Sequence, residues 1–230
     1  SPMSLHLVFL GNPGTGKTTV ARLLARIYHA IGILSKGQLV EVDRSGLVAG
    51  YVGQTAIKTQ KVIQKALGGV LFIDEAYALN GKSENDFGQE AIDTILKAME
   101  DHRDDLVVIV AGYTDLMDKF IHSNPGLESR FNRFLLFEDY TSEEMLDIFK
   151  MQCKKGCYQL SDGVEELVRD YITEENGDPE TFGNARGVRN IFEHILVAQN
   201  NRLAAMETVT KEDLMTLTQD DVLHARGKLD

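Results

Sequence analysis

Residues 11–18 carry an uninterrupted phosphate-binding motif, which reads Gly11-Asn12-Pro13-Gly14-Thr15-Gly16-Lys17-Thr18. Glycines allow successive backbone N–H groups to curl around phosphate oxygens, while Lys17 is placed for the β- and γ-phosphates and Thr18 for Mg²⁺. The motif follows an apolar run typical of a buried strand, Leu5–Leu10, and precedes an amphipathic helical pattern, Val20–Ile31. Because the N-terminus of a helix attracts anions, this strand–loop–helix order predicts a nucleotide-binding site.

Charge and composition narrow the classes of partner that the chain can have. Its 230 residues, 43% of them hydrophobic, can build one large domain with or without a small one. The net charge of −11 argues against a nucleic-acid backbone as the main partner. No apolar run approaches the ~18 residues of a membrane span, so we expect a cytoplasmic protein without membrane contact. Cys153 and Cys157 lack further ligands at zinc spacing, which favours free thiols.

Short apolar runs alternate with helical patterns as far as Tyr140. In one helical pattern Phe87, Ala91, Ile95 and Met99 recur on one face. Alternation of this kind predicts a parallel sheet covered by helices. We expect five strands, at Leu5–Leu10, Leu39–Val42, Val70–Ile73, Leu106–Ala111 and Phe134–Phe137.

Beyond Tyr140 the pattern becomes helical and contains no convincing strand. Capping boxes are predicted at Thr141 with Glu144 and at Asp162 with Glu165, and Thr210 is a further candidate cap. A long helix is expected over Arg186–Met206, and the acidic run 174–178 reads as an exposed loop. These patterns predict an α/β nucleotide-binding domain over residues 1–140 and a small helical domain over residues 141–230.

The segment Gly69–Glu75 separates hydrolysis from other uses of a phosphate loop. Its apolar strand delivers Asp74 and Glu75 to a carboxyl end, where parallel sheets place their ligand chemistry. Asp74 is expected to hold Mg²⁺, and Glu75 to act as the general base that polarises the attacking water. A kinase has no use for such a glutamate, so ATP hydrolysis is favoured; a solvated strand end is the alternative.

Six stretches together resemble one family, the AAA+ ATPases, and within it the CbbX/CfxQ/SpoVK group. The resemblance implies a P-loop AAA+ fold, in which a parallel five-stranded sheet with flanking helices is followed by a small all-α lid domain. It also implies a Mg–ATP-dependent enzyme that works as a ring, expected to be a hexamer. The stretches that carry it are Leu5–Thr19, Val48–Thr59, Lys65–Tyr77, Gln89–Asp93, Ala111–Tyr113 and Asn124–Arg130.

The resemblance assigns roles to several arginines. Arg130 fits an arginine finger that reaches the nucleotide of a neighbouring subunit, and Arg133 matches a second arginine of many relatives. For both, a surface salt bridge is the alternative. Arg186 resembles the sensor 2 residue that opens the lid helix, although Arg189 could make that contact instead. The implied nucleotide contacts are Asn12, Pro13, Gly14, Thr15, Gly16, Lys17, Thr18, Thr19 and Arg186, with Thr18 and Asp74 holding Mg²⁺.

A mobile loop is expected where Gly50-Tyr51-Val52-Gly53 follows the second strand. In AAA+ remodelling machines an aromatic–aliphatic–Gly loop at this place lines a central pore, so Tyr51, Val52 and Gly53 are implied to grip a polypeptide. Packing of Tyr51 against a helix end is the alternative. The chain has Ala111-Gly112-Tyr113 where many AAA+ proteins carry the sensor 1 residue, which leaves sensor 1 open between Tyr113 and Thr114.

The function expected from these features is ATP-driven remodelling of a protein substrate in a homo-oligomeric ring. A nucleotide-gated assembly scaffold is the second hypothesis, and a DNA-directed loader is a third that the acidity and the aromatic loop weaken. By resemblance the substrate is Rubisco or a sporulation-related protein. Whether a sugar-phosphate effector binds is not decided by these features. Because residues 1–4 resemble an artificial leader, we expect the natural protein to extend upstream, so this piece alone need not form the ring.

Overall fold

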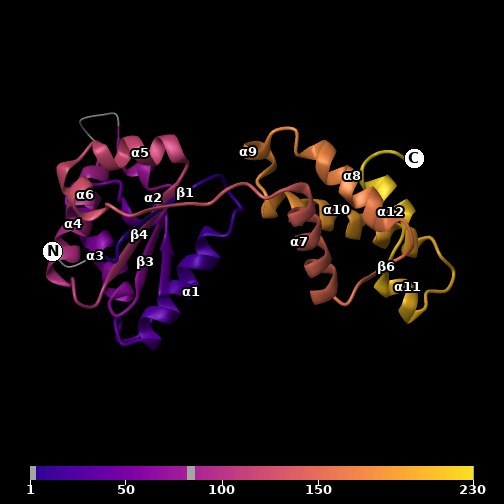
Figure 1. Cartoon of the computed structure of the whole chain (residues 1–230), viewed down its shortest axis with the longest axis horizontal. Helices are drawn as coiled ribbons and strands as arrows, with labels where there is room; N and C mark the ends of the chain where they lie inside the picture. Colours follow the sequence, from indigo (N-terminus) through magenta and orange to yellow (C-terminus); the bar gives the residue numbers. More distant parts are fainter. Residues whose placement is uncertain (1–3, 82–85, 230) are drawn as a thin grey trace. The chain divides into compact units, whose positions relative to one another are not determined.

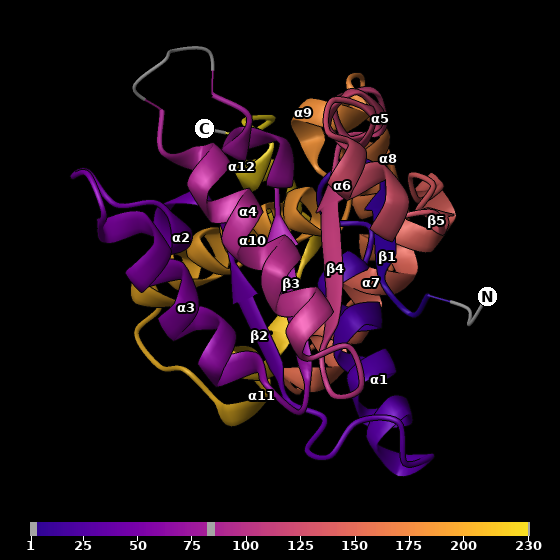
Figure 2. The ribbon, with the colours of Figure 1, turned by 90° about the vertical axis from the view of Figure 1, so that its left-hand side faces the viewer.

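The apolar runs of the first 140 residues form one parallel sheet in the computed structural model, which describes residues 4–81 and 86–229 (Figures 1 and 2). The strand order is β2-β3-β4-β1-β5, and every neighbouring pair is parallel. Each strand begins and ends within two residues of its prediction. The strands are β1 (Leu7–Leu10), β2 (Leu39–Val42), β3 (Val70–Asp74), β4 (Val107–Gly112) and β5 (Phe134–Leu136).

Alternate side chains of the strands pack on opposite faces of this sheet. Leu7, Phe9 and Phe72 are buried on the face covered by α1 (Lys17–Ala30), whereas Val8 and Leu71 lie on the other face. In Figure 2, α3 and α4 lie side by side in front of the strands. The remaining elements of this unit are α2 (Arg44–Leu47), α3 (Gln54–Ala66), the 3₁₀ turn η1 (Ala76–Leu79), α4 (Gly88–Asp101), α5 (Thr114–His122) and α6 (Pro125–Arg130).

The chain divides into two compact units. The first unit comprises Ser1–Gly11 and Gly16–Phe137, and the second comprises Asn12–Thr15 and Glu138–Asp230. The tip of the phosphate-binding motif therefore belongs with the C-terminal helices, while its two ends belong with the sheet.

Helices dominate the second unit, as predicted. They enclose a core that includes Phe149, Ile172 and Ile195, and the Thr141–Glu144 capping box opens the first of them. Thr210 also caps a helix, with Asp213 as its partner. The helices are α7 (Ser142–Lys155), α8 (Val164–Glu175), α9 (Pro179–Phe182), α10 (Ala185–Ala204), α11 (Lys211–Met215) and α12 (Gln219–Ala225).

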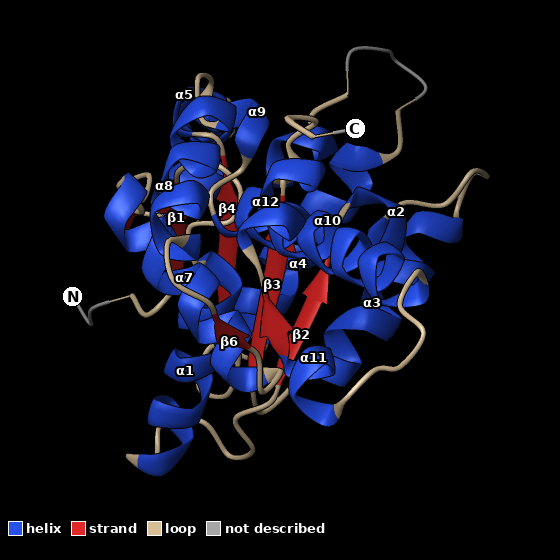
Figure 3. Ribbon diagram, turned by 90° about the vertical axis from the view of Figure 1, so that its right-hand side faces the viewer, coloured by secondary structure: helices blue, strands red, loops and turns tan. Residues whose placement is uncertain are grey.

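Three details of the second unit differ from the predictions. A short parallel pair, β6 (Gln159–Leu160) with β7 (Thr216–Leu217), occurs where no strand was expected, because two residues are too few to show a strand period (Figure 3). The predicted Asp162–Glu165 capping box is wrong, since Gly163 caps α8 in a left-handed conformation with φ of +82°. The acidic run is also not all loop, because its two glutamates end α8.

Two further properties complete the fold. Cys153 and Cys157 are free cysteines, the first buried and the second exposed, and burial raises the pKa of the Cys153 thiol to about 12. Over residues 4–81 and 86–229, none of the helices has the length and apolar character needed to cross a membrane.

Candidate functional site

In the first unit the ends of the phosphate-binding loop are shaped by glycine. Gly11 follows β1, has φ of +144° and donates its N–H to the Gly112 carbonyl at 3.1 Å. A Cβ at this position would lie 2.3 Å from the Phe137 carbonyl oxygen, so no larger residue fits. Gly16, with φ of +93°, precedes Lys17 at the first position of α1, and the Lys17 ammonium donates to the Gly11 carbonyl. Both ends of the loop in the first unit are therefore fixed at the carboxyl end of β1 and the start of α1.

The first turn of α1 suits an anion. It contains no acidic residue, and its N-cap is Gly16, which has no side chain to cap the N–H groups at the helix end. The Thr18 hydroxyl lies in this turn, 3.4 Å from the Glu41 carboxylate of β2, and Thr19 follows it on the exposed side. Hydroxyl and carboxylate oxygens are the ligands that Mg²⁺ prefers, so the donors present fit that ion together with a phosphate.

In the second unit a polar network holds the tip of the loop. Asn184 donates to the Pro13 carbonyl at 3.1 Å and to Asp139 at 2.9 Å, and Asp139 also accepts from Asn12 at 3.0 Å. Asn184 is buried and has φ of +52°, a conformation that its three hydrogen bonds must stabilise, the third coming from the Tyr140 N–H. The sequence analysis missed both Asp139 and Asn184 as contacts of the loop.

The neighbours of this network are the other tip residues and the start of the lid helix. Gly14 accepts a hydrogen bond from the Ala185 N–H at 3.1 Å, and the Thr15 carbonyl accepts one from the Tyr140 hydroxyl at 3.1 Å. Arg186 lies in the first turn of α10, as the sequence predicted for the residue that opens this helix. A cation there opposes the positive end of the helix, which favours a bound anion as its partner.

Asp74 ends β3 at the edge of the sheet where β1 also ends, and Glu75 follows it directly. Asp74 is in register with Ala111, and Ala111 with Phe9, so all three lie near the carboxyl ends of parallel strands. The Asp74 carboxylate accepts from the Glu75 N–H at 3.0 Å. Glu75 itself is exposed and has φ of +49°, a left-handed conformation that is rare outside glycine and clusters at functional sites.

Both candidate finger arginines lie around the end of α6. Arg130 is the last residue of that helix and pairs with Glu100 at 3.0 Å, while Arg133 donates to the Ser4 carbonyl at 3.2 Å. The carboxylate of the pair is 62% exposed, and exposed pairs contribute only about 0–1 kcal/mol. The Arg130 guanidinium also donates to the Gly126 carbonyl of the same helix at 3.2 Å, so the ion pair is one of the weak restraints on it.

The loop between α2 and α3 presents two apolar side chains to solvent. Tyr51 is 78% exposed and Val52 is 85% exposed, so Tyr51 does not pack against a helix end. Gly53, with φ of +79°, forms the N-cap of α3. For sensor 1, Tyr113 caps α5 and lies 6.4 Å from the Tyr77 ring, while Thr114 is the first residue of α5. Tyr113 and Thr114 therefore both stay candidates for the sensor 1 residue.

Two family models match the chain. One is the AAA family, described as "ATPase family associated with various cellular activities", which matches residues 7–139, and the other is an AAA lid domain, which matches residues 141–229. The chain belongs to the AAA ATPase family. This AAA protein is accordingly a nucleotide-binding ATP hydrolase.

Relatives place this AAA protein in the group that includes CfxQ and stage V sporulation protein K. It is 46% identical over 221 residues to stage V sporulation protein K of Bacillus subtilis (strain 168), covering 95% of this chain and 69% of that protein. It is 47% identical over 225 residues to the chloroplastic ribulose bisphosphate carboxylase/oxygenase activase of Cyanidioschyzon merolae, covering 96% and 76%. Protein CfxQ of Xanthobacter flavus is 44% identical over 221 residues, covering 92% and 69%.

Solved structures share the fold at much lower identity. The AAA domain of FIGL-1 superposes with a TM-score of 0.65 at 18% identity, covering 98% of this chain and 71% of that one. A second structure of that domain, in complex with ADP, gives a TM-score of 0.65 at 19% identity over 96% and 70%. The five-stranded sheet with its helical lid is therefore the AAA fold.

Proposed function

We propose that this ATPase works as a homo-oligomeric ring, a hexamer, in which Mg–ATP hydrolysis drives the Tyr51 loop against a protein substrate. The observation that carries the proposal is the exposure of Tyr51 and Val52 on a loop with glycines on both sides. A monomeric enzyme gains nothing from two large apolar side chains in water, whereas a machine that contacts polypeptides does. In this proposal residues 1–140 form the ATPase domain and residues 141–230 form the lid.

Each residue at the edge of the sheet has a defined part in the chemistry. Lys17 balances the negative charge of the phosphates, and the N–H groups of the loop and of α1 hold their oxygens. Mg²⁺, held through Thr18 and Asp74, supplies charge neutralisation when it is bound. Glu75 accepts a proton from the attacking water, a role that its exposed carboxylate at the end of β3 supports. Asn12, Pro13, Gly14, Thr15, Gly16, Thr19 and Arg186 complete the nucleotide contacts.

The ring is supported by the position of Arg130. We propose that its guanidinium leaves the weak pair with Glu100 and stabilises the γ-phosphate bound to the next subunit, with Arg133 as a second cation beside it. Because such an arginine completes the site of the next subunit, full ATPase activity requires the assembled ring. The names of the relatives suggest two substrate classes, Rubisco-like enzymes and sporulation-related proteins, and we expect the ATPase to act on them in the cytoplasm.

Two substitutions test the proposal. Glu75→Gln should still bind ATP but lower its turnover by at least about 100-fold, because a general base contributes roughly 10²–10⁴. Tyr51→Ala should keep basal ATP turnover and lose its stimulation by an unfolded test protein, carboxymethylated lactalbumin. Glu207→Gln and Met151→Ala are the matched controls, since both alter exposed side chains of the second unit.

The outcomes also separate the alternatives. Full turnover in Glu75→Gln would remove the assigned base. Unchanged stimulation in Tyr51→Ala would remove the gripping role from Tyr51. Absence of any stimulation of the parent chain by the unfolded protein would favour the nucleotide-gated scaffold, because a scaffold does not act on a polypeptide. Stimulation by DNA in place of protein would favour the loader.

A further inference from the structure

The Tyr51 loop comprises residues 48–53, between α2 and α3. Its tip is exposed, whereas its base, formed by α2 and the first half of α3, is held by hydrogen bonds. The Ala49 N–H donates to the Thr55 hydroxyl at 3.1 Å, and the Thr59 hydroxyl donates to the Leu47 carbonyl at 2.9 Å in the buried interior. Lys58 donates to the Ser45 and Val48 carbonyls at 2.6 and 3.2 Å. These bonds join α2 to α3 on both sides of the loop. A shift of α2 therefore moves the tip with it, although the tip residues themselves are exposed.

Arg44, the first residue of α2, connects this base to η1, the turn that follows β3 and Glu75. Its guanidinium donates from Nη1 to the Ala78 carbonyl at 2.7 Å and from Nη2 to the Asp86 carboxylate at 2.8 Å. Ala78 belongs to η1, the 3₁₀ turn that begins directly after Glu75. Only two residues separate Glu75 from Ala78. The side chain of Arg44 therefore links the proposed catalytic carboxylate of Glu75 to the helices that hold the Tyr51 loop.

Packing around the guanidinium is tight enough to transmit a displacement. A Cβ added to Gly88, the first residue of α4, would lie 1.9 Å from the Leu79 carbonyl and 3.0 Å from Arg44 Nη1. The Asp86 carboxylate also accepts from the Gly88 N–H at 2.8 Å. The Arg44 guanidinium, followed by that N–H, lowers the pKa of Asp86 below its ordinary value, so the carboxylate stays charged. Arg44 is thus held by η1 and by the start of α4 together.

A second contact ties α4 to the far side of the loop. The Glu90 carboxylate of α4 accepts from the Ala56 N–H at 3.1 Å, in the first turn of α3. Figure 2 shows α2, α3 and α4 on one side of the sheet. Arg44 differs from this contact because its guanidinium donates to a carbonyl of η1, the turn that follows Glu75.

We propose that Arg44 is a positioning residue that passes movements of the Glu75–η1 segment to the Tyr51 loop. The inference rests on the proposed role of that loop in contacting a protein substrate. The left-handed backbone at Glu75 is strained in a way that a change of bound nucleotide can relieve or impose. Such a change rotates η1, and the two hydrogen bonds that the Arg44 guanidinium donates transmit this rotation to α2.

A fluorescent reporter on the loop tests this without any protein substrate. Val52→Cys in a Cys157→Ser background places one reactive thiol on the tip, since Cys153 is buried and its pKa is raised. The anisotropy of the attached dye is compared between Mg–ADP and Mg–ATPγS. The parent chain should show a clear difference between the two nucleotides. Arg44→Ala should reduce that difference at least about fivefold while ATP turnover stays within about twofold.

Matched variants separate coupling from simple loosening of the loop. Lys58→Met breaks bonds within the base but leaves the link to η1, so it should keep most of the anisotropy difference. Arg44→Lys keeps the charge, but one ammonium cannot replace the fork that holds two partners, so it should also lower the difference. If Arg44→Ala fails to fold, Arg44→Lys takes its place in the comparison.

Three results would overturn the inference. These are an unchanged anisotropy difference in both Arg44 variants, no difference in the parent chain, and a loss of ATP turnover that matches the loss of the difference. The proposed function is judged separately by Tyr51→Ala and the unfolded test protein. A loop that responds through Arg44 while Tyr51→Ala keeps its stimulation would uphold the coupling and remove the gripping role.

Discussion

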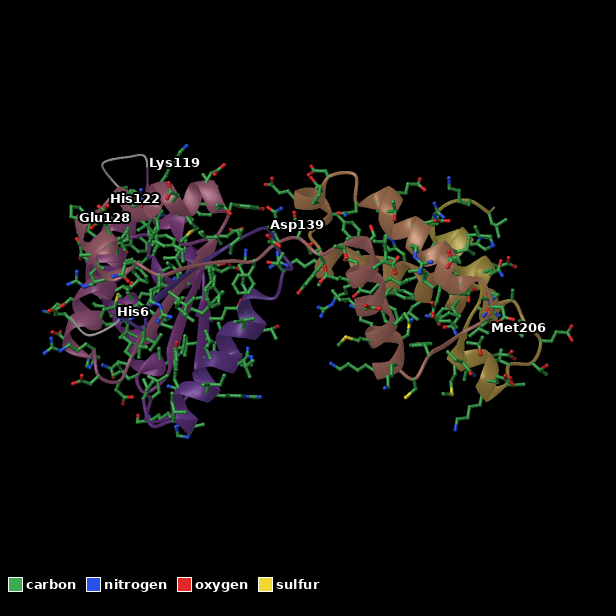
Figure 4. The ribbon with its side chains drawn as sticks, viewed as in Figure 1. His6, Lys119, His122, Glu128, Asp139 and Met206 are labelled. Atoms are coloured by element: carbon green, nitrogen blue, oxygen red, sulfur yellow. The ribbon has the colours of Figure 1, made fainter. Side chains whose placement is uncertain are left out.

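His6 gives the first unit a stability that depends on pH in a calculable way. Its ring lies at the start of β1, and Nδ1 accepts the Val108 N–H of β4 at 2.9 Å, which fixes the neutral tautomer with the proton on Nε2 (Figure 4). Burial, followed by the nearby Arg130 charge, lowers the pKa of His6 from 6.5 to about 4. Protonation would replace the acceptor at Nδ1 with a second donor and break the bond to Val108.

The sign and size follow from this difference in pKa. Below pH 6.5 the unfolded chain binds a proton at His6 that the folded chain refuses until about pH 4, so stability falls as the pH drops through this window. At pH 5 the proton-linked factor is roughly 30, which corresponds to about 2 kcal/mol. Near pH 7.5 the same factor is close to one, so the contribution is absent there.

His6→Asn removes the titration and keeps the hydrogen bond, because the amide oxygen can occupy the place of Nδ1. Hydrogen exchange of β4 amides, measured where reclosing is faster than exchange, reports opening of the first unit. The protection of the parent chain relative to His6→Asn should fall by about 30-fold between pH 7.5 and pH 5. The intrinsic exchange rates cancel, because both proteins are compared at the same pH.

The control is His224→Asn, which alters an exposed histidine of the second unit and should leave the relative protection of β4 unchanged. A ratio between the parent chain and His6→Asn that stays constant from pH 7.5 to pH 5 would refute the reasoning. It would mean that His6 titrates alike in the folded and unfolded chains.

Two further predictions concern assembly and the second unit. Arg130→Ala and Lys17→Ala subunits, each inactive alone, should regain up to about a quarter of normal ATP turnover when mixed one to one in rings, because that fraction of interfaces pairs an intact loop with an intact finger; turnover that stays at zero would place Arg130 outside the neighbour's site. Thr141→Ala should lower the free energy of unfolding by about 1 kcal/mol, and Thr141→Ser by much less, as it keeps the oxygen that accepts the Glu144 N–H; equal losses in urea unfolding would show that the cap contributes nothing.

The central strands of the sheet could be read from the sequence because they are buried on both faces. Such strands are short, continuous apolar runs, and Val70–Asp74 and Val107–Gly112 stand out from their surroundings for this reason. The phosphate-binding motif and the Asp74–Glu75 pair could likewise be predicted, since each consists of neighbours in the chain. Local capping was less reliable, because a glycine in a left-handed conformation at Gly163 replaced the expected side-chain cap.

Contacts between distant segments could not be predicted. Asn184 reaches the Pro13 carbonyl across 171 positions, and Arg44 reaches the Ala78 carbonyl across 34. In both cases the acceptor is a backbone carbonyl, which every residue possesses, so the sequence carries no mark of the partner. The positive φ of Asn184 and of Glu75 is a local sign of constraint, but it belongs to the folded backbone and leaves no mark in the sequence.

Two arginines of the first unit differ in the exposure of the carboxylate with which each one pairs. Arg130 pairs with a carboxylate that is 62% exposed, so water and salt can replace that partner at little cost when another anion arrives. Both arginines also donate to a backbone carbonyl, Arg130 to that of Gly126 and Arg44 to that of Ala78. The carboxylate that Arg44 holds, however, is only 19% exposed, so losing Arg44 would leave a poorly solvated charge. The pair of Arg130 is therefore the easier one to exchange, which supports its proposed role at a neighbouring subunit. The pair of Arg44 is the harder one to lose, which supports its proposed role in coupling within the chain.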